Sequence, residues 1–345
     1  MENLVRVCVD AMGGDNAPAS VVQGAVDAVN ESAKVRVILT GDEKAIRDEL
    51  SAKKYPEDRI EIRHTTQVIE TAEHPVKAIM SKKDSSIVVG LRMVQHGEAD
   101  AFVSAGNSGA VLVGGQSIVG RIRGIERPPF AALIPTQKGV ALLVDSGANV
   151  DARSSHLVQW AQMGSIYMEK IVGIKKPRVG ILNIGAEEEK GNALVKETFP
   201  LLKQDGTINF VGSCEARDIP AGVCDVIVCD GFAGNIVLKM YEGVAGVLLS
   251  EVKKGLMSSL RSKIGALLIK PALKNTLKSF DSSAYGGAPM LGLNGLVVKT
   301  HGSAKAKEVK NSILQCEQFV REDVNGKIKT GILKAKEDTA KGEKE

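Results

Sequence analysis

The sequence predicts an α/β fold in which a mostly parallel sheet is flanked by helices. Hydrophobic residues make up 43% of the 345 residues, aromatic residues only 3%, and glycine occurs 36 times. The core must therefore consist mainly of aliphatic side chains, with many tight turns between elements. Short apolar runs also alternate with segments in which apolar residues recur at helical spacing, which is typical of strands connected by helices. We expect one two-lobed domain over residues 1–325 and a charged, flexible tail over residues 326–345.

Six apolar runs are predicted to be strands of this sheet. They are Val5–Val9, Val35–Leu39, Ala101–Ser104, Arg178–Leu182, Ile208–Val211 and Asp225–Cys229. Two further runs, Phe130–Pro135 and Gly139–Val144, are separated by only three residues and predict an antiparallel hairpin that marks the change between lobes. The spacing of apolar residues predicts a helix from Ser154 to Val172.

Cysteine usage and hydropathy indicate the compartment. The five cysteines lie mostly in apolar runs and show neither a C-x-x-C pair nor the spacing of metal ligands, so we expect reduced thiols and no metal site. No charged-then-apolar leader opens the sequence, and no run approaches the roughly 18 uninterrupted apolar residues that a spanning helix requires. We expect a cytoplasmic protein.

The net charge of +4 conceals one basic block, because Val252–Phe280 holds seven Lys or Arg and no acidic residue. Basic residues are not spread over a face with aromatic platforms, so we expect no nucleic-acid partner. On a helical projection the apolar residues of the block fall within an arc of about 120°. These residues are Leu256, Met257, Leu260, Ile264, Leu267 and Leu268. Pro271 should end or kink this helix, and Ala272–Phe280 should start a second piece.

We expect residues 252–280 to form a protruding tip that contacts an anionic membrane surface reversibly, at the inner face of the cell membrane. The alternative is an ordinary amphipathic helix, whose apolar arc packs on the body of the protein or across a subunit interface.

Two polar loops follow strands in the first half of the chain. The segment Asp10–Pro18 contains Gly13 and Gly14, and the segment Ser104–Gly109 precedes an apolar helix. Ligands of open α/β sheets bind beyond the carboxyl ends of the strands, and helix N-termini attract phosphate. Neither loop has the spacing of a dinucleotide fingerprint or of a Walker loop. The alternatives are a turn chosen for geometry alone and simple capping of the helix by Ser104 and Ser108.

Two similar loops follow strands in the second half. In Asn183–Asn192, Lys190 follows three glutamates, and Asp230–Asn235 leads from an apolar strand into a long helix. A lysine at the ligand edge of a sheet can neutralise phosphate or a developing oxyanion. A solvated ion pair with a neighbouring glutamate is the alternative for Lys190.

Together these motifs resemble the PlsX-type phosphate acyltransferase family. The motifs are Val9–Asp15, Ser104–Gly109, Asn183–Gly185 with Glu187, Lys190–Asn192, and Asp230–Phe232 with Gly234–Asn235. The resemblance extends from about Val5 to Val320 and shows no departure from the family's motifs. It implies transfer of a fatty acyl group from acyl carrier protein to inorganic phosphate, forming acyl phosphate for phospholipid synthesis. It also implies a homodimer, no cofactor, and a fold related to isocitrate and isopropylmalate dehydrogenases and to phosphotransacetylase.

On this basis we predict the roles of the site residues. Ser104, Asn107, Ser108 and Gly109, with Gly13 and Gly14, are expected to bind phosphate, and Lys190 to supply the cation. Asp10, Asn183, Asp230 and Asn235 are expected to orient these groups. No Ser–His or Cys–His arrangement is evident, so we expect phosphate to attack the thioester directly, without a covalent acyl-enzyme.

Other functions are less consistent with the sequence. A dehydrogenase of the related fold needs an arginine cluster and several metal-binding aspartates, and neither forms a compact motif. None of the five histidines shows the H-x-x-x-x-D spacing of another acyltransferase class. A phosphotransacetylase-like enzyme that uses acyl coenzyme A and a non-catalytic acyl-carrier or lipid scaffold remain alternatives. Expected partners include the acidic acyl carrier protein, steered by basic residues, and a glycerol-phosphate acyltransferase that uses acyl phosphate.

Overall fold

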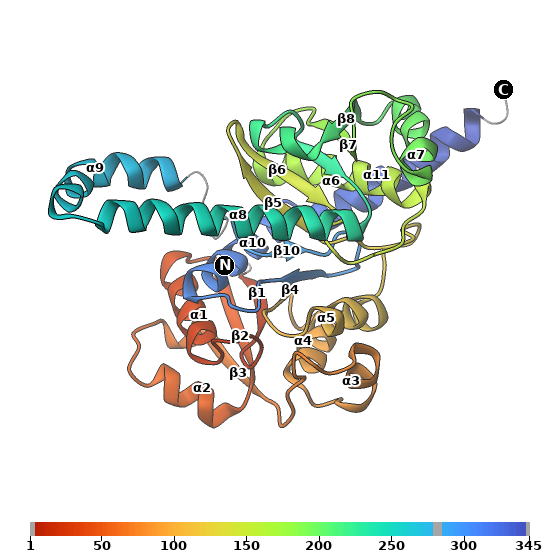
Figure 1. Cartoon of the computed structure of the whole chain (residues 1–345). Helices are drawn as coiled ribbons and strands as arrows, with labels where there is room; N and C mark the ends of the chain where they lie inside the picture. Colours follow the sequence, from red (N-terminus) through yellow and green to blue (C-terminus); the bar gives the residue numbers. More distant parts are fainter. Residues whose placement is uncertain (1–3, 279–284, 343–345) are drawn as a thin grey trace.

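The protein consists of two α/β lobes, each built on its own sheet (Figure 1). A computed structural model describes residues 4–278 and 285–342, and for residues 274–278 and 335–342 it describes the backbone alone. The first sheet has the strand order β10-β11-β4-β1-β2-β3, and the second has the order β5-β6-β9-β7-β8. Mostly parallel strands flanked by helices confirm the predicted class, although the strands form two sheets.

The first lobe is built from the N-terminal part of the chain and from a later segment that begins at β10 and ends with α10. Its strands are β1 (Val5–Asp10), β2 (Val35–Gly41), β3 (Ile60–His64), β4 (Ala101–Ser104), β10 (Ala288–Pro289) and β11 (Leu296–Lys299). Its helices are α1 (Ala19–Glu31), α2 (Glu43–Leu50), α3 (Pro75–Ser81), α4 (Ser86–Gln95), α5 (Ser108–Gly114) and α10 (Ala306–Arg321), with a short turn of 3-10 helix, η1 (Glu57–Arg59), and one of π-helix, η2 (Gly115–Val119). Only β10 is antiparallel to its neighbour.

The second lobe is built from the middle of the chain and from the C-terminal helix. Its strands are β5 (Ala131–Thr136), β6 (Gly139–Val144), β7 (Arg178–Asn183), β8 (Asn209–Glu215) and β9 (Val226–Val228). Its helices are α6 (Ser154–Tyr167), α7 (Ala193–Gln204), α8 (Gly231–Met257), α9 (Leu260–Lys278) and α11 (Val324–Gly342), with the short turns η3 (Met168–Val172) and η4 (Ala216–Ala221). Strands β5 and β6 pair antiparallel, and β6, β9, β7 and β8 pair parallel.

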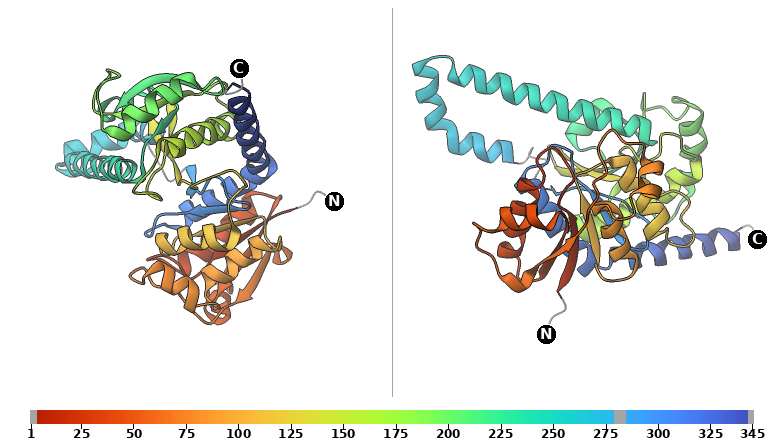
Figure 2. Two further views of the ribbon diagram at one scale, coloured as in Figure 1. Left: turned by 90° about the vertical axis from the view of Figure 1, so that its right-hand side faces the viewer. Right: turned by 90° about the horizontal axis from the view of Figure 1, so that it is seen from below.

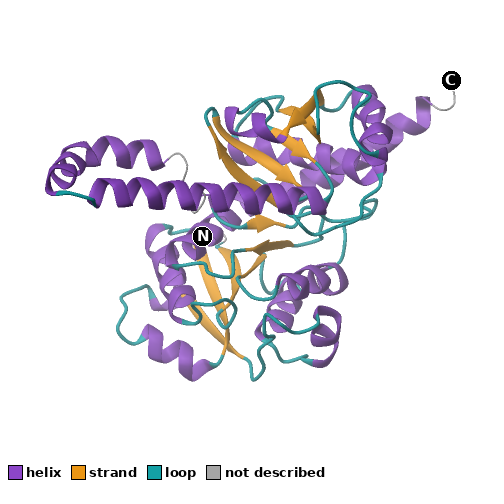
Figure 3. Cartoon of the chain, viewed as in Figure 1, coloured by secondary structure: helices purple, strands orange, loops and turns teal. Residues whose placement is uncertain are grey.

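Helices cover both faces of the first sheet, which explains its nearly continuous apolar strands. Val7 and Val9 of β1 point to the face that carries α1 and α10, while Cys8 and Phe102 pack with α4 on the other face. The alternation of side chains along a strand thus divides the core into two layers, one beneath the helices on each face of the sheet. Figure 3 shows these helices on either side of the strands.

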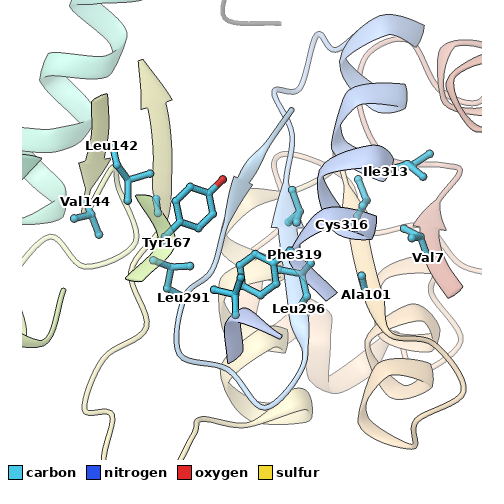
Figure 4. Packing of buried hydrophobic residues seen from close by; sticks show 14 of the residues in the cluster. Val7, Ala101, Leu142, Val144, Tyr167, Leu291, Leu296, Ile313, Cys316 and Phe319 are labelled. Carbon is cyan, nitrogen blue, oxygen red and sulfur yellow. The ribbon is translucent and has the colours of Figure 1, made fainter. Parts of the chain in front are cut away.

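One core layer continues from the first lobe into the second. Tyr167 of α6 and Phe319 of α10 lie with ring centroids 6.2 Å apart, and Gln315 Nε2 donates a hydrogen bond of 3.0 Å to the Tyr167 hydroxyl. Figure 4 shows this junction, with Leu291 beside both rings. Because the two lobes share this core, the carboxyl ends of the strands of one sheet are held in place relative to those of the other.

The basic block forms a protruding tip, but the helix break differs from the prediction. Helix α8 runs out of the body, and α9 folds back alongside it (Figure 2). The break lies at Ser258–Ser259, where the Ser259 hydroxyl accepts a hydrogen bond of 3.1 Å from the Ser262 amide. Of the two predicted outcomes at Pro271, an end or a kink of the helix, the end does not occur, because α9 continues through it to Lys278. Its neighbours are exposed, so water can satisfy the carbonyl left without a partner. The end of the predicted second piece, residues 279 and 280, lies outside the described residues.

Helix α8 is long and apolar enough, by length and composition, to cross a membrane. It has 27 residues. Its most apolar stretch has a mean hydropathy of 1.3, and almost none of that stretch is buried. We expected no spanning segment, because no run approaches roughly 18 uninterrupted apolar residues. In α8 the apolar residues are interrupted by Lys239, Glu242 and Glu251. Because charged residues interrupt its sequence, we interpret α8 as a surface helix with an unusually apolar exposed side.

The tail is helical where a flexible segment was expected. Residues 326–342 belong to α11, and Val324, Ile328 and Ile332 are buried against α6 and the shared core. The spacing i, i+4, i+8 places these three side chains on one face of a helix. The prediction of a disordered tail was therefore wrong for this stretch, because a sparse apolar stripe was masked by many Lys and Glu residues.

Candidate active site

A cavity of about 1180 Å³ opens between the two lobes. Its apolar wall comes from β5 and from the inner sides of α8 and α9, and includes Phe130, Ala132, Ile134, Leu238, Ala245, Leu249 and Leu273. Its polar wall comes from both lobes, from the N-terminal parts of α5 and α8, the end of β11 and the loops that follow β6 and β11, and includes Ser108, Ser146, Asn235, Lys239, Lys299, His301 and Ser303. The cavity can therefore hold an anionic group beside an apolar chain.

Three neighbouring strands of the first sheet end at the polar wall. β11, β4 and β1 lie side by side, and they end in Lys299, Ser104 and Asp10. The Ser104 hydroxyl donates a hydrogen bond of 2.7 Å to the Asp10 carboxylate and accepts one of 3.0 Å from the Gly106 amide. The Met12 amide donates a bond of 3.2 Å to the same carboxylate.

Asp10 is only 1% exposed. Burial raises the pKa of its carboxyl, while hydrogen bonds from Ser86, Ser104 and Met12 and the charge of Lys299 oppose that shift. The ionised form of Asp10 therefore depends on these donors and on the nearby cation.

The glycines after β1 let three loops interlock. A Cβ on Gly13 would lie 2.2 Å from Asp10 Oδ2 and 2.7 Å from the Gly106 nitrogen. Gly14 has a φ of +99°, and a Cβ there would lie 2.8 Å from the Gly302 carbonyl oxygen. That carbonyl accepts a hydrogen bond of 2.8 Å from the Asp15 amide. The structure thus brings Gly13 and Gly14 against the loops that follow β4 and β11.

Within the loop Ser104–Gly109, each predicted phosphate ligand lies in a different setting. Asn107 is the helix cap, since its Oδ1 accepts a bond of 2.9 Å from the Ala110 amide. Its amide nitrogen donates to the carbonyls of Glu70, Thr71 and Glu73, at 3.0, 3.1 and 3.0 Å. Ser108 is exposed and lines the cavity. A Cβ on Gly109 would lie 2.4 Å from Cγ of Pro75, so this position requires glycine to pack on α3.

The predicted residues of the second lobe are arranged differently. Asn183 is buried, and its amide nitrogen donates to the Lys190 carbonyl at 3.2 Å and to the Ser213 hydroxyl at 3.1 Å. The Lys190 side chain is 51% exposed and pairs with Glu187 at 2.9 Å, which lowers the pKa of that glutamate. Asp230 caps α8 by accepting a bond of 2.8 Å from the Ala233 amide. Of these residues and Asn235, only Asn235 lines the cavity.

Sequence reasoning missed the cluster that follows β11. His301 contacts the Ser303 hydroxyl through Nδ1 at 2.8 Å and Lys239 Nζ through Nε2 at 3.2 Å. Lys239 also donates to Glu242 at 2.9 Å. The four-residue strand Leu296–Lys299 was not recognised, so Lys299 was not placed at the ligand edge of the sheet.

The sequence analysis also missed Asp145, whose hydrogen bonds order the loop that follows β6. This buried carboxylate accepts hydrogen bonds of 2.6 to 3.1 Å from the backbone amides of Phe130, Gly147, Ala148 and Asn149, and one from the Asn149 side chain. Burial raises its pKa, and these donors oppose the shift. The bonds order Ser146 and Gly147 at the cavity wall. Among the residues that the structure describes, no cluster of three or more His, Cys, Asp or Glu side chains is arranged to bind a metal ion.

Comparison with known proteins identifies the family. A family described as fatty acid synthesis protein matches residues 5–327. A phosphate acyltransferase of Clostridium perfringens is 46% identical over 98% of this chain and 99% of its own, and one of Brevibacillus brevis is 48% identical over 96% and 98%. Among solved structures, phosphotransacetylases of Streptococcus pyogenes and Staphylococcus aureus superpose with TM-scores of 0.62 and 0.58. They are 18% and 19% identical and cover 92% and 91% of this chain and 94% of their own, so they share its fold. With its motifs matched in order and near full-length identity to these relatives, the chain belongs to the phosphate acyltransferase family that its sequence resembles.

Proposed function

We propose that this enzyme transfers a fatty acyl group from acyl carrier protein to inorganic phosphate in the cavity between the lobes. The product is an acyl phosphate for phospholipid synthesis. The observation that carries the proposal is a single cavity with an apolar wall on β5 and α8 and a cationic, hydroxyl-bearing wall on the facing loops. The names of the relatives, phosphate acyltransferases, agree with this chemistry.

The reaction requires positioning more than activation. Phosphate is already ionised at neutral pH, and one of its oxygens attacks the thioester carbonyl carbon. The carbon–oxygen double bond re-forms as the carbon–sulfur bond breaks, and the sulfur leaves as a thiolate that takes a proton from solvent. The enzyme has to hold the two reactants together and stabilise the carbonyl oxygen as negative charge develops.

The residues beside the cavity fit different parts of this task. Ser108 and Asn235 lie on its wall and can contact substrate directly. Asp10 and Ser104 lie one layer behind it and position the loop that carries Gly106. Asn107, Asn183 and Asp230 position their own loops through the hydrogen bonds described above. A role for Lys190 as a cation for phosphate stays a prediction.

The donor is tested by comparing acyl thioesters. Purified enzyme with phosphate and palmitoyl-acyl carrier protein should form acyl phosphate, which hydroxylamine traps as a hydroxamate. Palmitoyl coenzyme A should react with a kcat/KM lower by at least about tenfold, since it lacks the acidic carrier surface. Equal or better turnover with the coenzyme A ester would favour the phosphotransacetylase-like alternative. No acyl phosphate from either donor would favour a binding scaffold.

Direct attack is tested by quenched single-turnover reactions with radiolabelled acyl donor. We expect the label to pass to phosphate without appearing on the protein. The five cysteines are all buried, which agrees with this expectation. An acylated serine or cysteine that forms and decays as fast as product appears would contradict it.

We also propose that the tip formed by α8 and α9 binds an anionic membrane surface. Leu260, Ile264, Leu267 and Leu268 are 79%, 62%, 69% and 76% exposed, and Arg261, Lys263 and Lys270 accompany them on α9. Met257 is exposed at the end of α8, whereas Leu256 is half-buried. Each basic residue near an anionic leaflet can contribute about 1 kcal/mol. Docking would bring acyl phosphate to a membrane-bound acyltransferase that transfers it to glycerol phosphate.

Vesicle co-sedimentation tests the tip. The wild type should pellet with anionic liposomes at low salt and be released at high salt, because screening weakens the electrostatic contribution. Leu260→Glu with Ile264→Glu should stay in the supernatant and keep activity on soluble substrates. A double variant that no longer folds or dimerises would mean that the apolar arc belongs to an interface.

A homodimer formed through α8 is the third part of the proposal. Phe232, Ile236, Met240, Val244 and Val247 are all exposed, and they fall within an arc of about 120° on one side of the helix. A straight apolar stripe can pair with its own copy across a two-fold axis. Met240→Glu with Val244→Glu should give a monomer by light scattering, whereas the tip variant should stay dimeric. A dimer that survives the α8 substitutions would exclude this interface.

A further inference from the structure

Among the side chains that the structure describes, four lysines line the cavity, and Lys299 differs from the other three. Lys239 is bonded to Glu242 and contacts His301, Lys270 lies exposed on the tip, and Lys307 belongs to α10. Lys299 is half-buried, and its ammonium donates a hydrogen bond to the Thr300 carbonyl. Within residues 4–278 and 285–342, no carboxylate lies at ion-pair distance from it, although its strand lies beside β4, whose following loop is one of the three interlocking loops.

The backbone holds Lys299 in register with the predicted phosphate loop. Lys299 of β11 lies opposite Ser104 of β4, and the Thr300 amide donates a bond of 2.9 Å to the Ser104 carbonyl. Ser104 in turn bonds Asp10 on the next strand. The ammonium, the hydroxyl and the carboxylate therefore stand in a row at the ends of three adjacent strands.

The charges around Lys299 leave its ammonium incompletely neutralised. Asp10 from β1 and Asp15 from the following loop favour its charge, whereas Lys239 from α8 opposes it. Burial is the larger influence and lowers the pKa of Lys299 to about 8. Asp10 uses its oxygens for Ser104 and Met12. A partly dehydrated cation at a cavity wall with no carboxylate in contact favours an anionic ligand.

We propose that Lys299 is the cation that binds the phosphate acceptor, with Ser104 and Asp10 as the pair that positions it. This inference rests on the proposed function, because it names the residue that holds one of the two substrates. Lys299 keeps its proton throughout, since phosphate attacks as an anion and the departing thiolate is protonated from solvent. Its ammonium holds the phosphate charge beside the apolar wall where the acyl chain lies.

Binding of inorganic phosphate alone, measured by isothermal titration calorimetry without an acyl donor, tests the inference. Lys299→Gln should raise the dissociation constant for phosphate by on the order of 10 to 10²-fold, as expected when a charge-assisted contact is lost. In turnover assays its KM for phosphate should rise more than its KM for the acyl donor. Lys270→Gln is the matched control on the same cavity, and its phosphate affinity should equal that of the wild type.

The pH dependence gives a second reading that requires no loss-of-function variant. Wild-type phosphate affinity should fall by about tenfold or more between about pH 7.5 and 9.5, as the lysine loses its proton. Lys299→Arg should bind phosphate with little change over this range, because a guanidinium stays charged. If Lys299→Gln fails to fold, the wild-type pH profile alone decides, and a constant affinity would overturn the inference.

The outcomes separate this inference from the proposed function. Normal phosphate affinity in a folded Lys299→Gln enzyme that still makes acyl phosphate would overturn the role of Lys299 and leave the activity intact. Lys299-dependent phosphate binding in a protein that forms no acyl phosphate from any thioester would support the phosphate site and exclude the acyl transfer.

Discussion

The two lobes use the same local pattern at their strand ends and build different environments with it. In each, a buried strand runs into a loop that carries glycine and a polar side chain. In the first lobe Asp10, Ser104 and Lys299 come from three adjacent strands and contact one another's loops. In the second lobe Lys190 pairs with Glu187 from its own loop, in solvent. A similar sequence pattern can therefore produce either a preorganised wall or a self-contained turn, depending on what the neighbouring strands contribute.

The largest effect expected from this difference is that of Gly13→Ala. The added Cβ would meet Asp10 Oδ2 at 2.2 Å and the Gly106 nitrogen at 2.7 Å, so two loops must separate. A displacement of about 1 Å at a reacting centre can cost on the order of 10²-fold in rate. We expect kcat/KM to fall by that much, measured beside far-UV circular dichroism to show that the protein is folded.

Gly185→Ala is the matched control in the second lobe. There the added Cβ would meet Cδ of Lys190 at 2.4 Å, and that flexible side chain can move into solvent. We expect activity within about twofold of wild type, because exposed side chains adjust at little cost. Equal losses in the two variants would mean that the two loops contribute equally to catalysis.

A second large effect is expected at Asn107, on stability. Its side chain caps α5 and bonds three carbonyls of residues 70–73, so Asn107→Ala leaves several polar groups without partners. We expect the free energy of unfolding in urea to fall by about 2 to 3 kcal/mol. Ser108→Ala, one residue on, should leave stability unchanged and raise the KM for phosphate. Reversed effects would show that Asn107 faces the ligand and Ser108 supports the fold.

A smaller effect should appear at Ser104, with a particular pH dependence. Ser104→Ala removes one donor to the Asp10 carboxylate, whose pKa burial already raises, so that pKa should rise further. If the ionised carboxylate positions the loop, activity should begin to fall at a higher pH in the variant than in the wild type as the solution is acidified. Activity near pH 8 should fall by about tenfold, the size of one hydrogen bond to a charged group.

Ser312→Ala provides the control for Ser104. Ser312 is also fully buried, but its hydroxyl donates to the Glu308 carbonyl within α10. As the solution is acidified, the activity of Ser312→Ala should begin to fall at the same pH as that of the wild type. If the activity of Ser104→Ala falls at the same pH as that of the wild type, the Ser104–Asp10 hydrogen bond has no part in the reaction.

The comparison also explains which parts of the fold and of the site could be predicted from the sequence. Strand runs such as Val5–Val9 are dense in β-branched residues, so the α/β class and most strands could be predicted. Ser108 and Asn235 reach the cavity, as expected of polar residues after strands. Lys299 was missed because the four-residue strand β11 is defined by its pairing with β4. Every residue of β11 lies at least 192 positions after Ser104 in the sequence. Such long-range pairing leaves no local signal.

The same limit explains why the two helical extensions continue further than expected. Pro271 is a strong local breaker, yet an exposed helix tolerates it because water reaches the unpaired carbonyl. In α11 three isolated apolar residues, Val324, Ile328 and Ile332, are sufficient because α6 covers them. In both cases the deciding contact, solvent in one and a helix in the other, comes from outside the segment.

The smallest effect in the comparison is expected at Lys190, and it decides between two views of the second lobe. From the sequence, Lys190 neutralises phosphate, and Lys190→Ala should then lose on the order of 10²–10³ in rate. In the structure its side chain is 51% exposed, pairs with Glu187, and is not among the residues that line the cavity. Exposed ion pairs of this kind contribute little, because water competes for both partners. We therefore expect Lys190→Ala to keep kcat and the KM for phosphate within about twofold of the wild type. Glu187→Ala should do the same, since it removes the other half of the pair. A large loss in Lys190→Ala with normal activity in Glu187→Ala would instead show that the lysine leaves its partner and reaches phosphate during turnover, which would require the second lobe's loop to move toward the cavity.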